Sequence, residues 1–413
     1  MVAHTTFSTT RGRRSWPRGR RLAPALLVAC FVALAVAPPP AARAEVSQSV
    51  TLEATNTLSR GPDDTLLAAG AGRAELDLRS AGSRYVRGRL QLRTAVETDD
   101  PAADLEVPRA FVKARFPLTE ASYFHLTAGR ARLTWGDGAF YNAADTLFGK
   151  VGENPDFTAE TIRDETAWLA AGFFPLGRFS FVEPVVLVPL PEETDGALLP
   201  REAEDAAAGF RIQGKLGEVK AEASYLLRGT GSYHQPAVSV QGNLGVDVYA
   251  GATTRIPGID SALDEDAVTE EAAFTAGVLH IEEGRSGQSL TLRLEGLLRP
   301  WKEWEADGAG PEDRAAGAAA DAAAGGGTVA TAYALELFPE VVWQPAQSLS
   351  VYLRSVVSPV DVSALIIPGV SWSPYSGLTF SLFAGLQAGE AGDTYGWDRA
   401  GGASLGTSVR YVY

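Results

Sequence analysis

Apolar and polar residues alternate along most of the chain after position 45. From Leu290 to Leu298, and again from Leu378 to Ala388, every second residue is apolar or glycine. Alternation with a period of two places one set of side chains on each face of a β-strand. This pattern predicts eighteen strands, which begin near Val46, Gly72, Arg84, Val107, Ser122, Ile162, Arg178, Ala207, Glu218, Pro236, Val246, Ala272, Gln288, Val329, Gln347, Val362, Gly377 and Gly401.

The predicted connections between these strands alternate in length. Every second one is a tight turn, such as Leu216-Gly217, whereas most of the others are longer, polar and acidic. A soluble sandwich shares the period of two, but short turns alternating with long loops are typical of outer-membrane barrels. The sequence therefore predicts an all-β fold, a transmembrane antiparallel up-and-down β-barrel with short periplasmic turns and long external loops. About 18 strands are expected, and 16 stays open because the second and tenth are weak.

The first 44 residues are interpreted as a signal peptide. A start rich in arginine precedes an apolar run from Leu22 to Ala37, and Ala42-Arg43-Ala44 offers the small residues of a cleavage site. We expect Sec export, cleavage near Ala44 and a single barrel domain over residues 45–413. A lipoprotein signal at Cys30 is the alternative, although the apolar run continues past that residue.

The charge and cysteine content of the mature chain exclude several classes of function. Removing the seven arginines of residues 1–44 leaves 29 basic and 50 acidic residues, a formal charge of −21, which argues against nucleic acid as a partner. Cys30 is the one cysteine, so the mature chain has no disulfide, thiolate or cysteine-based zinc site. The sequence predicts no cofactor, no metal site and no enzymatic activity, and no recognisable nucleophile–base arrangement surrounds its histidines.

Aromatic residues lie where a barrel meets the membrane interfaces. Trp301 and Trp304 follow an outward-running predicted strand, while Trp343 and Trp372 end inward-running ones, which suits two aromatic girdles. The chain ends in alternating apolar residues and resembles the C-terminal signal of bacterial outer-membrane barrels. The resemblance implies outer-membrane lipid and the barrel-assembly machinery as partners, the latter through Val409, Tyr411 and Tyr413.

Several predicted strands near the N-terminus carry arginine on one face and apolar residues on the other. An arginine in the middle of the bilayer costs roughly 2–4 kcal/mol, so these rows are expected to line the interior. The alternative is that each arginine pairs with a nearby acid, such as Glu75 or Asp77, and plugs the barrel. The predicted basic wall consists of Arg87, Arg89, Arg93, Arg109, Lys113, Arg115, Arg130 and Arg132.

The third external connection, residues 136–161, is unusual for a loop. It combines apolar residues such as Phe140, Tyr141 and Phe148 with several acids. We predict that it folds into the lumen, buries its apolar groups against the wall and holds its carboxylates opposite the arginines. The predicted acidic lip consists of Asp137, Asp145, Glu153 and Asp156.

This layout resembles that of the general bacterial porins, in which the third loop forms a constriction between loop acids and a basic wall. The stretch from Gly129 to Asp145 also resembles a "GR…WG…NPxD" pattern of poorly characterised outer-membrane barrels, with Ala144 in place of its proline. The short acidic motif of the porin loop is not matched residue for residue. The resemblance implies passive diffusion of small hydrophilic solutes or ions.

Alternatives remain open at this level. Long acidic loops also suit a non-conducting adhesin or structural barrel, and an apolar lower lumen would suit a specific channel for a less polar solute. A homotrimer is compatible with the sequence. Residues 300–328, rich in alanine and glycine, are expected to form a disordered external loop.

Overall fold

The structure is a computed structural model. It describes residues 46–60, 65–80, 85–98, 103–119, 122–151, 155–188, 192–194, 197–199, 206–229, 233–257, 271–284, 287–304, 333–390, 393–397 and 402–413. The predicted signal peptide, most of the 300–328 loop and Glu153 lie outside these residues. Among the described residues, no helix has the length and apolar character needed to cross a membrane.

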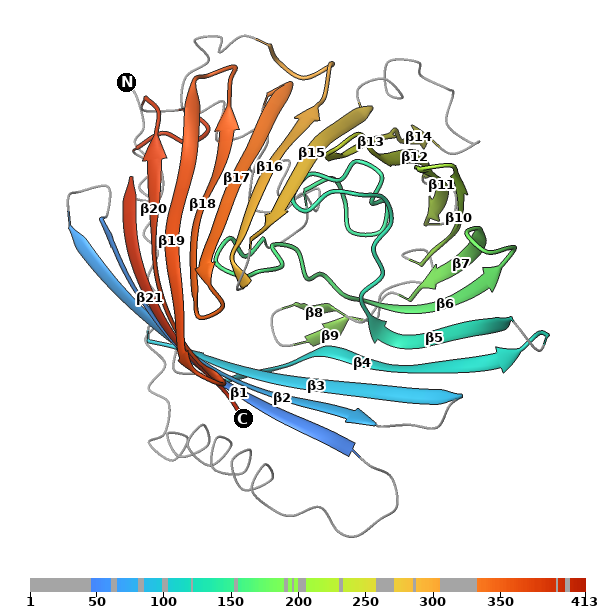
Figure 1. The fold of residues 1–413 in the computed structure, drawn as a ribbon, viewed down its shortest axis with the longest axis horizontal. Coiled ribbons are helices and arrows are strands. Elements are labelled where there is room, and N and C mark those ends of the chain that lie inside the picture. The colour runs from blue at the N-terminus through green and yellow to red at the C-terminus, as the bar shows by residue number, and fades with distance from the viewer. Residues whose placement is uncertain are drawn as a thin grey trace, which may run out of the picture. The chain divides into compact units, whose positions relative to one another are not determined.

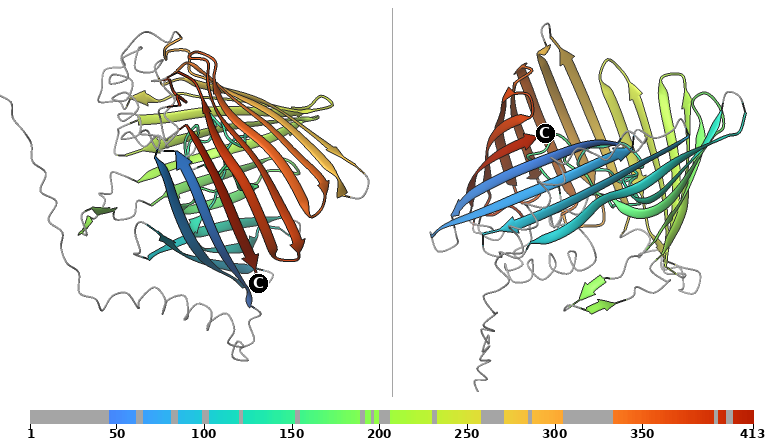
Figure 2. Two further views of the ribbon diagram at one scale, coloured as in Figure 1. Left: turned by 90° about the vertical axis from the view of Figure 1, so that its left-hand side faces the viewer. Right: turned by 90° about the horizontal axis from the view of Figure 1, so that it is seen from below.

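The described chain is a closed antiparallel β-barrel of eighteen long strands (Figures 1 and 2). Each strand pairs with the next along the sheet, and β1 pairs with β21 to close it. The strands are β1 Val46–Arg60, β2 Leu66–Ser80, β3 Val86–Glu97, β4 Asp104–Pro117, β5 Tyr123–Ala131, β6 Ala167–Pro175, β7 Phe181–Leu187, β10 Ala207–Leu216, β11 Val219–Arg228, β12 Tyr233–Asn243, β13 Asp247–Thr253, β15 Ala273–Glu283, β16 Ser289–Leu298, β17 Leu335–Ala346, β18 Leu349–Ser358, β19 Ser363–Tyr375, β20 Leu378–Ala388 and β21 Ala403–Val412.

Three short strands stand apart from these eighteen. β8 Glu192–Thr194 and β9 Ala197–Leu199 form a small separate sheet in the connection between β7 and β10. β14 Ile256–Pro257 follows β13 and pairs with the beginning of β12. The predicted all-β antiparallel barrel and the count of 18 are therefore confirmed, and the weak second and tenth strands (β2 and β12) are both present.

Some strand limits differ from the prediction. β2 begins at Leu66 and not near Gly72, because the apolar and small residues 66–71 extend its pairing with β1. β6 begins at Ala167 and not near Ile162, since Ile162 is buried within the preceding connection. The predicted start near Val329 falls just before residues 333–346, in which β17 begins at Leu335.

The two faces of each strand differ in chemistry as the alternation predicts. On β3 and β4, Val86, Leu90 and Val112 are between 37% and 50% exposed and point away from the barrel axis. Arg89, at the opposite parity, bonds Asp77 on the inner face of β2. An apolar outer surface around a polar interior is the arrangement that a lipid bilayer requires of a barrel.

Aromatic side chains gather on the outer face near the short turns. Phe116, Phe124 and Phe174 stack in a row across β4, β5 and β6, with ring centroids 5.7 and 4.3 Å apart. Trp343 and Trp372 are each 52% exposed near the ends of β17 and β19. We call the end of the barrel where β6 meets β7 and β10 meets β11 the short-turn end.

Candidate functional site

The described part of the connection between β5 and β6, residues 132–151 and 155–166, folds into the interior of the barrel (Figure 1). Trp135, Phe140 and Tyr141 are each 0% exposed. Phe140 packs against Phe338 of β17, with ring centroids 4.8 Å apart, and Trp135 belongs to a cluster with Leu169 and Leu226 of the wall. The apolar residues that make this segment unusual as a loop are thus its contacts with the wall.

Glycine permits the sharp turn at the start of this folded loop. Gly138 has a φ of 139°, and a Cβ atom there would lie 2.2 Å from the carbonyl oxygen of Tyr141. Any other residue at position 138 would therefore be strained and would collide with the backbone. This geometry explains why the Trp135-Gly136-Asp137-Gly138 sequence ends in glycine.

One wall carboxylate holds the tip of the loop. Glu295 of β16 is 0% exposed and accepts hydrogen bonds from the backbone nitrogens of Ala139, Phe140 and Tyr141 at 2.7, 2.9 and 2.8 Å. The hydroxyl of Tyr249 on β13 donates to the same carboxylate. Hydrogen bonds to an ionised acceptor are stronger than neutral ones, so this contact fixes the backbone of three consecutive residues.

Other wall acids hold the loop on either side of this tip. The Tyr141 hydroxyl donates to Glu336 at 2.8 Å, and the Gly136 backbone nitrogen donates to Glu222 at 2.7 Å. The Trp135 indole nitrogen donates to Glu183 at 3.2 Å. Arg211 bonds Glu183 and Glu222 and so joins β7, β10 and β11 behind the loop.

These wall acids were missed by the sequence reasoning, although a signal for them exists. Glu183, Glu222, Glu295 and Glu336 all lie within strands, at positions whose alternation points inward. The argument that placed arginines inside the barrel applies equally to a carboxylate in mid-strand. What the sequence does not reveal is their partner, because the loop residues they bind lie far away along the chain.

The three described acids of the predicted lip, Asp137, Asp145 and Asp156, form no ion pair with the arginines of β3 and β4. Asp137 forms an ion pair with Lys220 of β11. Asp145 is buried and bonds Arg163 within the loop at 3.1 Å, while Asp156 accepts hydrogen bonds from the Thr158 and Ala159 backbone. Each of these carboxylates is instead compensated by a nearer cation or by backbone nitrogens.

Burial shifts the pKa of two charged groups in the loop. Loss of water raises the pKa of Asp145 to about 6, although the nearby charge of Arg163 opposes the change. Loss of water also lowers the pKa of Lys150 to about 8, against the attraction of Glu271. The Lys150 ammonium donates to the Glu271 carbonyl oxygen at 3.2 Å.

Six of the predicted basic residues share the inner face of β3 and β4. Two of them are paired with acids of β2, because Arg89 bonds Asp77 at 2.8 Å and Arg93 bonds Glu75 at 3.2 Å. This is the pairing that the sequence left open as an alternative. A third, Arg109, pairs with Asp164. Among the described residues, no carboxylate lies within ion-pair distance of the other three, Arg87, Lys113 and Arg115.

Arg130 and Arg132 lie differently from the other six. Arg130 stands opposite Ala110 of β4, on the outer face that also carries Phe124, and donates to the Thr166 hydroxyl at 3.1 Å. Arg130 is therefore placed outside the inner row, in correction of the prediction, because β5 keeps a regular register with β4. Arg132 follows the end of β5 and lies 3.4 Å from Asp164.

Asp164 is the loop acid that does meet the basic wall. Its carboxylate pairs with Arg109 and lies near Arg132, at the root of the loop. The sequence reasoning missed it, because the predicted loop ended at residue 161 and Asp164 was assigned to a strand. Among the described residues, no group of acids, histidines or cysteines is arranged to hold a metal ion.

Comparisons with known proteins show similarity in fold and not in sequence. No family model matches the chain, and no curated protein sequence is similar to it. The crystal structure of Acinetobacter baumannii OccAB4 matches 89% of this chain and 98% of its own length at 10% identity, with a TM-score of 0.52. The chain has the porin fold.

Two further porin structures show the same likeness. Acinetobacter baumannii OccAB3 covers 89% of this chain and 99% of its own, at 8% identity and a TM-score of 0.51. Pseudomonas aeruginosa OccK2 (OpdF), crystallised in complex with glucuronate, covers 89% and 96%, at 11% identity and a TM-score of 0.51. At these identities the likeness extends to the architecture of the porin and to nothing finer.

Proposed function

We propose that this porin-fold barrel is an outer-membrane channel for the passive diffusion of small hydrophilic solutes or ions. The observation that carries the proposal is the exposure of charged side chains inside a closed barrel. Arg87, Lys113 and Arg115 point inward from β3 and β4, yet remain exposed to solvent. A barrel of 18 strands is wide enough to leave an aqueous path beside its filling.

The folded loop supports this proposal by filling one side of the lumen. Its contacts fall on β7, β11, β16 and β17, through Glu183, Glu222, Glu295 and Glu336. In Figure 1 the segment after β5 lies toward β13 and β15, with β3 and β4 on the other side of the barrel. The proposed path therefore runs between the loop and the basic wall.

The charges along this path favour anions. No described carboxylate forms an ion pair with Arg87, Lys113 or Arg115. The loop acids Asp137 and Asp145, in contrast, are each paired with a cation. Fixed positive charge lining a narrow aqueous path raises the local concentration of anions and hinders cations. Arg87, Lys113 and Arg115 therefore account for most of the role proposed for the basic wall. The charge of Arg109 in the same wall is neutralised by Asp164.

The test is single-channel recording of the refolded chain from Glu45 to Tyr413 in a planar bilayer with a salt gradient. We expect discrete conductance steps and a reversal potential that indicates anion preference. The triple variant Arg87→Gln, Lys113→Gln and Arg115→Gln should conduct but shift the reversal potential toward cations. A folded barrel that leaves the bilayer sealed would refute the channel and favour a non-conducting surface barrel.

We infer the route to the membrane from the sequence and the outer surface. The proposed sequence of events is Sec export, cleavage near Ala44 and insertion by the barrel-assembly machinery. Val409 and Tyr411 of β21 are 42% and 44% exposed, and Tyr413, directly after that strand, is 70% exposed, so that machinery would reach all three. A homotrimer is part of the same proposal, and cross-linking of the protein in its native membrane would test it.

A further inference from the structure

A second segment packs against the folded loop, at the end of the barrel opposite the short-turn end. It consists of residues 393–397, in the connection between β20 and β21, and we call it the strap. Tyr395 of the strap is 6% exposed and lies in the same apolar cluster as Phe140 and Tyr141, at the tip of the folded loop, and Phe338 of β17. The strap therefore covers the tip of the loop beside which the proposed path runs.

Two buried side chains where β18 turns into β19 hold the strap. Asp361 accepts a hydrogen bond from the Thr394 backbone nitrogen at 2.7 Å, and the Ser363 hydroxyl accepts one from the Tyr395 backbone nitrogen at 3.2 Å. The same hydroxyl donates to Asp361 at 2.8 Å. Because a hydrogen bond to an ionised acceptor is stronger than a neutral one, the backbone of the strap is fixed mainly at Thr394.

Glycine makes room for the strap at both of its ends. A Cβ atom on Gly389, directly after β20, would lie 2.8 Å from the Cβ atom of Ser363 and 3.0 Å from the Tyr395 carbonyl oxygen. Gly402, directly before β21, has a φ of 67°, and a Cβ atom there would lie 2.7 Å from the Trp397 carbonyl oxygen. A side chain at Gly389 would therefore push the strap out of its place.

Two buried polar atoms beneath the strap oppose its closed position. Glu336 of β17 is buried and accepts the hydrogen bond from the Tyr141 hydroxyl that anchors the loop. Loss of water, and then the charges of Glu336 and Asp361, raise the pKa of Tyr395 well above its usual value, which places the Tyr395 hydroxyl near both carboxylates. Neither that hydroxyl nor Oε1 of Glu336 has a hydrogen-bond partner among the described residues, although Arg299 lies 3.7 Å from Oε1. Burying such atoms is costly, and both would gain hydrogen bonds to water if the strap lifted.

We propose that the strap is a latch: while it is closed, Tyr395 holds the tip of the folded loop in place, and its opening releases the tip to move across the proposed path. Apolar packing and the two backbone hydrogen bonds keep the latch closed, whereas the buried polar atoms favour the open form. Local opening of this kind needs less free energy than unfolding of the barrel, so it occurs within the folded protein. Tyr395 is a positioning residue, since it acts through the loop and not on the solute.

This inference rests on the proposed channel for its electrical readout, whereas hydrogen exchange of the loop does not require conduction. Single-channel recordings of Tyr395→Ala and Gly389→Ala should show brief closures at least about tenfold more often than those of the unchanged protein, at the same open-channel conductance. Gly389→Ala displaces the strap without removing a ring, so it tests the latch even if Tyr395→Ala folds poorly. In both variants the amides of Ala139, Phe140 and Tyr141 should exchange severalfold faster.

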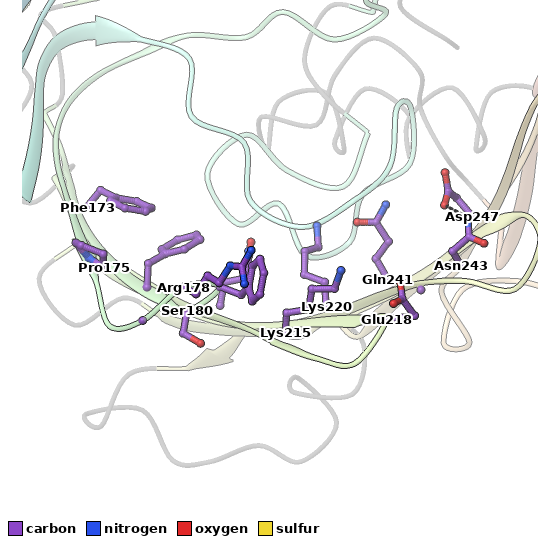
Figure 3. A pocket seen from close by; sticks show the side chains of 15 residues that line it. Phe173, Pro175, Arg178, Ser180, Lys215, Glu218, Lys220, Gln241, Asn243 and Asp247 are labelled. Carbon is purple, nitrogen blue, oxygen red and sulfur yellow. Dashed lines mark hydrogen bonds between the residues drawn. The ribbon is translucent and has the colours of Figure 1, made fainter. Parts of the chain in front are cut away.

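Two control variants separate the latch from a general loosening of the barrel. Tyr395→Phe keeps the ring and removes the buried hydroxyl, so closures should be no more frequent than in the unchanged protein. Phe173→Ala removes a ring from the cavity at the short-turn end (Figure 3), where Phe173 packs against His125 and Phe181. It should leave both the closures and the exchange of the loop unchanged, because the strap lies at the opposite end of the barrel.

Three results would overturn the latch. The first is a conducting barrel in which closures and loop exchange stay the same in both Tyr395→Ala and Gly389→Ala. The second is closures as frequent in Tyr395→Phe as in Tyr395→Ala, since the ring would then not hold the tip. The third is an equal increase in Phe173→Ala. A sealed bilayer, with loop exchange still accelerated in Gly389→Ala but not in Phe173→Ala, would refute the channel and leave the hold of the strap on the loop standing.

Discussion

At the scale of single residues, the interior is governed by the cost of burying charge. Glu295 is fully buried, and three backbone nitrogens and a tyrosine hydroxyl surround its carboxylate. Asp145 is similarly buried, but it depends on one arginine and two backbone nitrogens. The difference matters because a buried carboxylate with fewer hydrogen bonds and opposite charges to replace water is protonated more readily.

The raised pKa of Asp145 predicts a dependence of stability on pH. A pKa of about 6 in the folded state, against 3.8 as the ordinary value, means that the folded protein binds this proton more tightly than the unfolded chain. The free energy of unfolding should therefore rise as the pH falls from about 7 to about 4, by at most about 3 kcal/mol from this group. Asp145→Asn should remove this rise.

Urea unfolding of the refolded barrel between pH 4 and pH 8 would measure the effect. The control is Asp361→Asn, since burial raises the pKa of Asp361 but hydrogen bonds from the Ser363 hydroxyl and the Thr394 backbone nitrogen help to lower it overall. The Asp361→Asn variant should be less stable than the unchanged protein at pH values at which Asp361 is ionised. At lower pH, where Asp361 is protonated, the two should be equally stable. Parallel pH curves for the unchanged protein and Asp145→Asn would contradict the assignment to Asp145.

At the scale of elements, the folded loop has the character of a fixed part of the wall. Its anchors come from four separate strands, and its aromatic residues pack against the inner face. A loop that merely covered the lumen would lack buried partners on so many strands. Glu295 is the central anchor, because it alone binds three consecutive backbone nitrogens.

Glu295→Gln should loosen the loop without unfolding the barrel. A glutamine keeps one acceptor oxygen but turns an NH₂ group toward backbone donors, and each charge-assisted hydrogen bond that is lost costs about 1.5–3 kcal/mol. Amide hydrogen exchange in residues 137–151 should accelerate at least tenfold while the strands stay protected. Glu53→Gln is the matched control, because Glu53 contacts Ser408 and Arg73 of the wall and none of the loop. Equal exchange in both variants would show that the aromatic packing alone holds the loop.

How much of this could be read from the sequence also differs between elements. Alternation identified the strands, and the apolar residues Phe140 and Tyr141 revealed that the loop folds inward. The loop's partners were not predictable, because Glu295 and Tyr141 are 154 residues apart and only the closed sheet brings them together. The partner of Asp137 was missed for the same reason, since Lys220 belongs to a strand 83 residues further on.

At the scale of the whole molecule, the barrel separates two solvents. The inner faces of β1 and β2 carry Glu53, Glu75 and Asp77, while the outer faces carry residues such as Leu52. Because successive side chains point to opposite faces, neighbouring residues on one strand lie in opposite environments, lipid on one side and water on the other. The fold class was predictable from this pattern alone. A strand residue on the wrong face would place a polar side chain against lipid, which is unfavourable at every position along every strand.

The same separation gives a prediction for two adjacent residues of β1. Leu52 is 38% exposed on the outer face opposite Ala74, whereas Thr51 stands opposite Glu75 on the inner face. Leu52→Arg places a guanidinium against lipid and should lower the free energy of unfolding by about 2–4 kcal/mol. Thr51→Arg gives the same charge a carboxylate and water, so its effect should stay below about 1 kcal/mol. Both would be measured by urea unfolding in lipid vesicles. Equal losses would mean that this part of β1 does not face the bilayer, whereas the expected difference would require membrane outside the barrel and water within it at that depth.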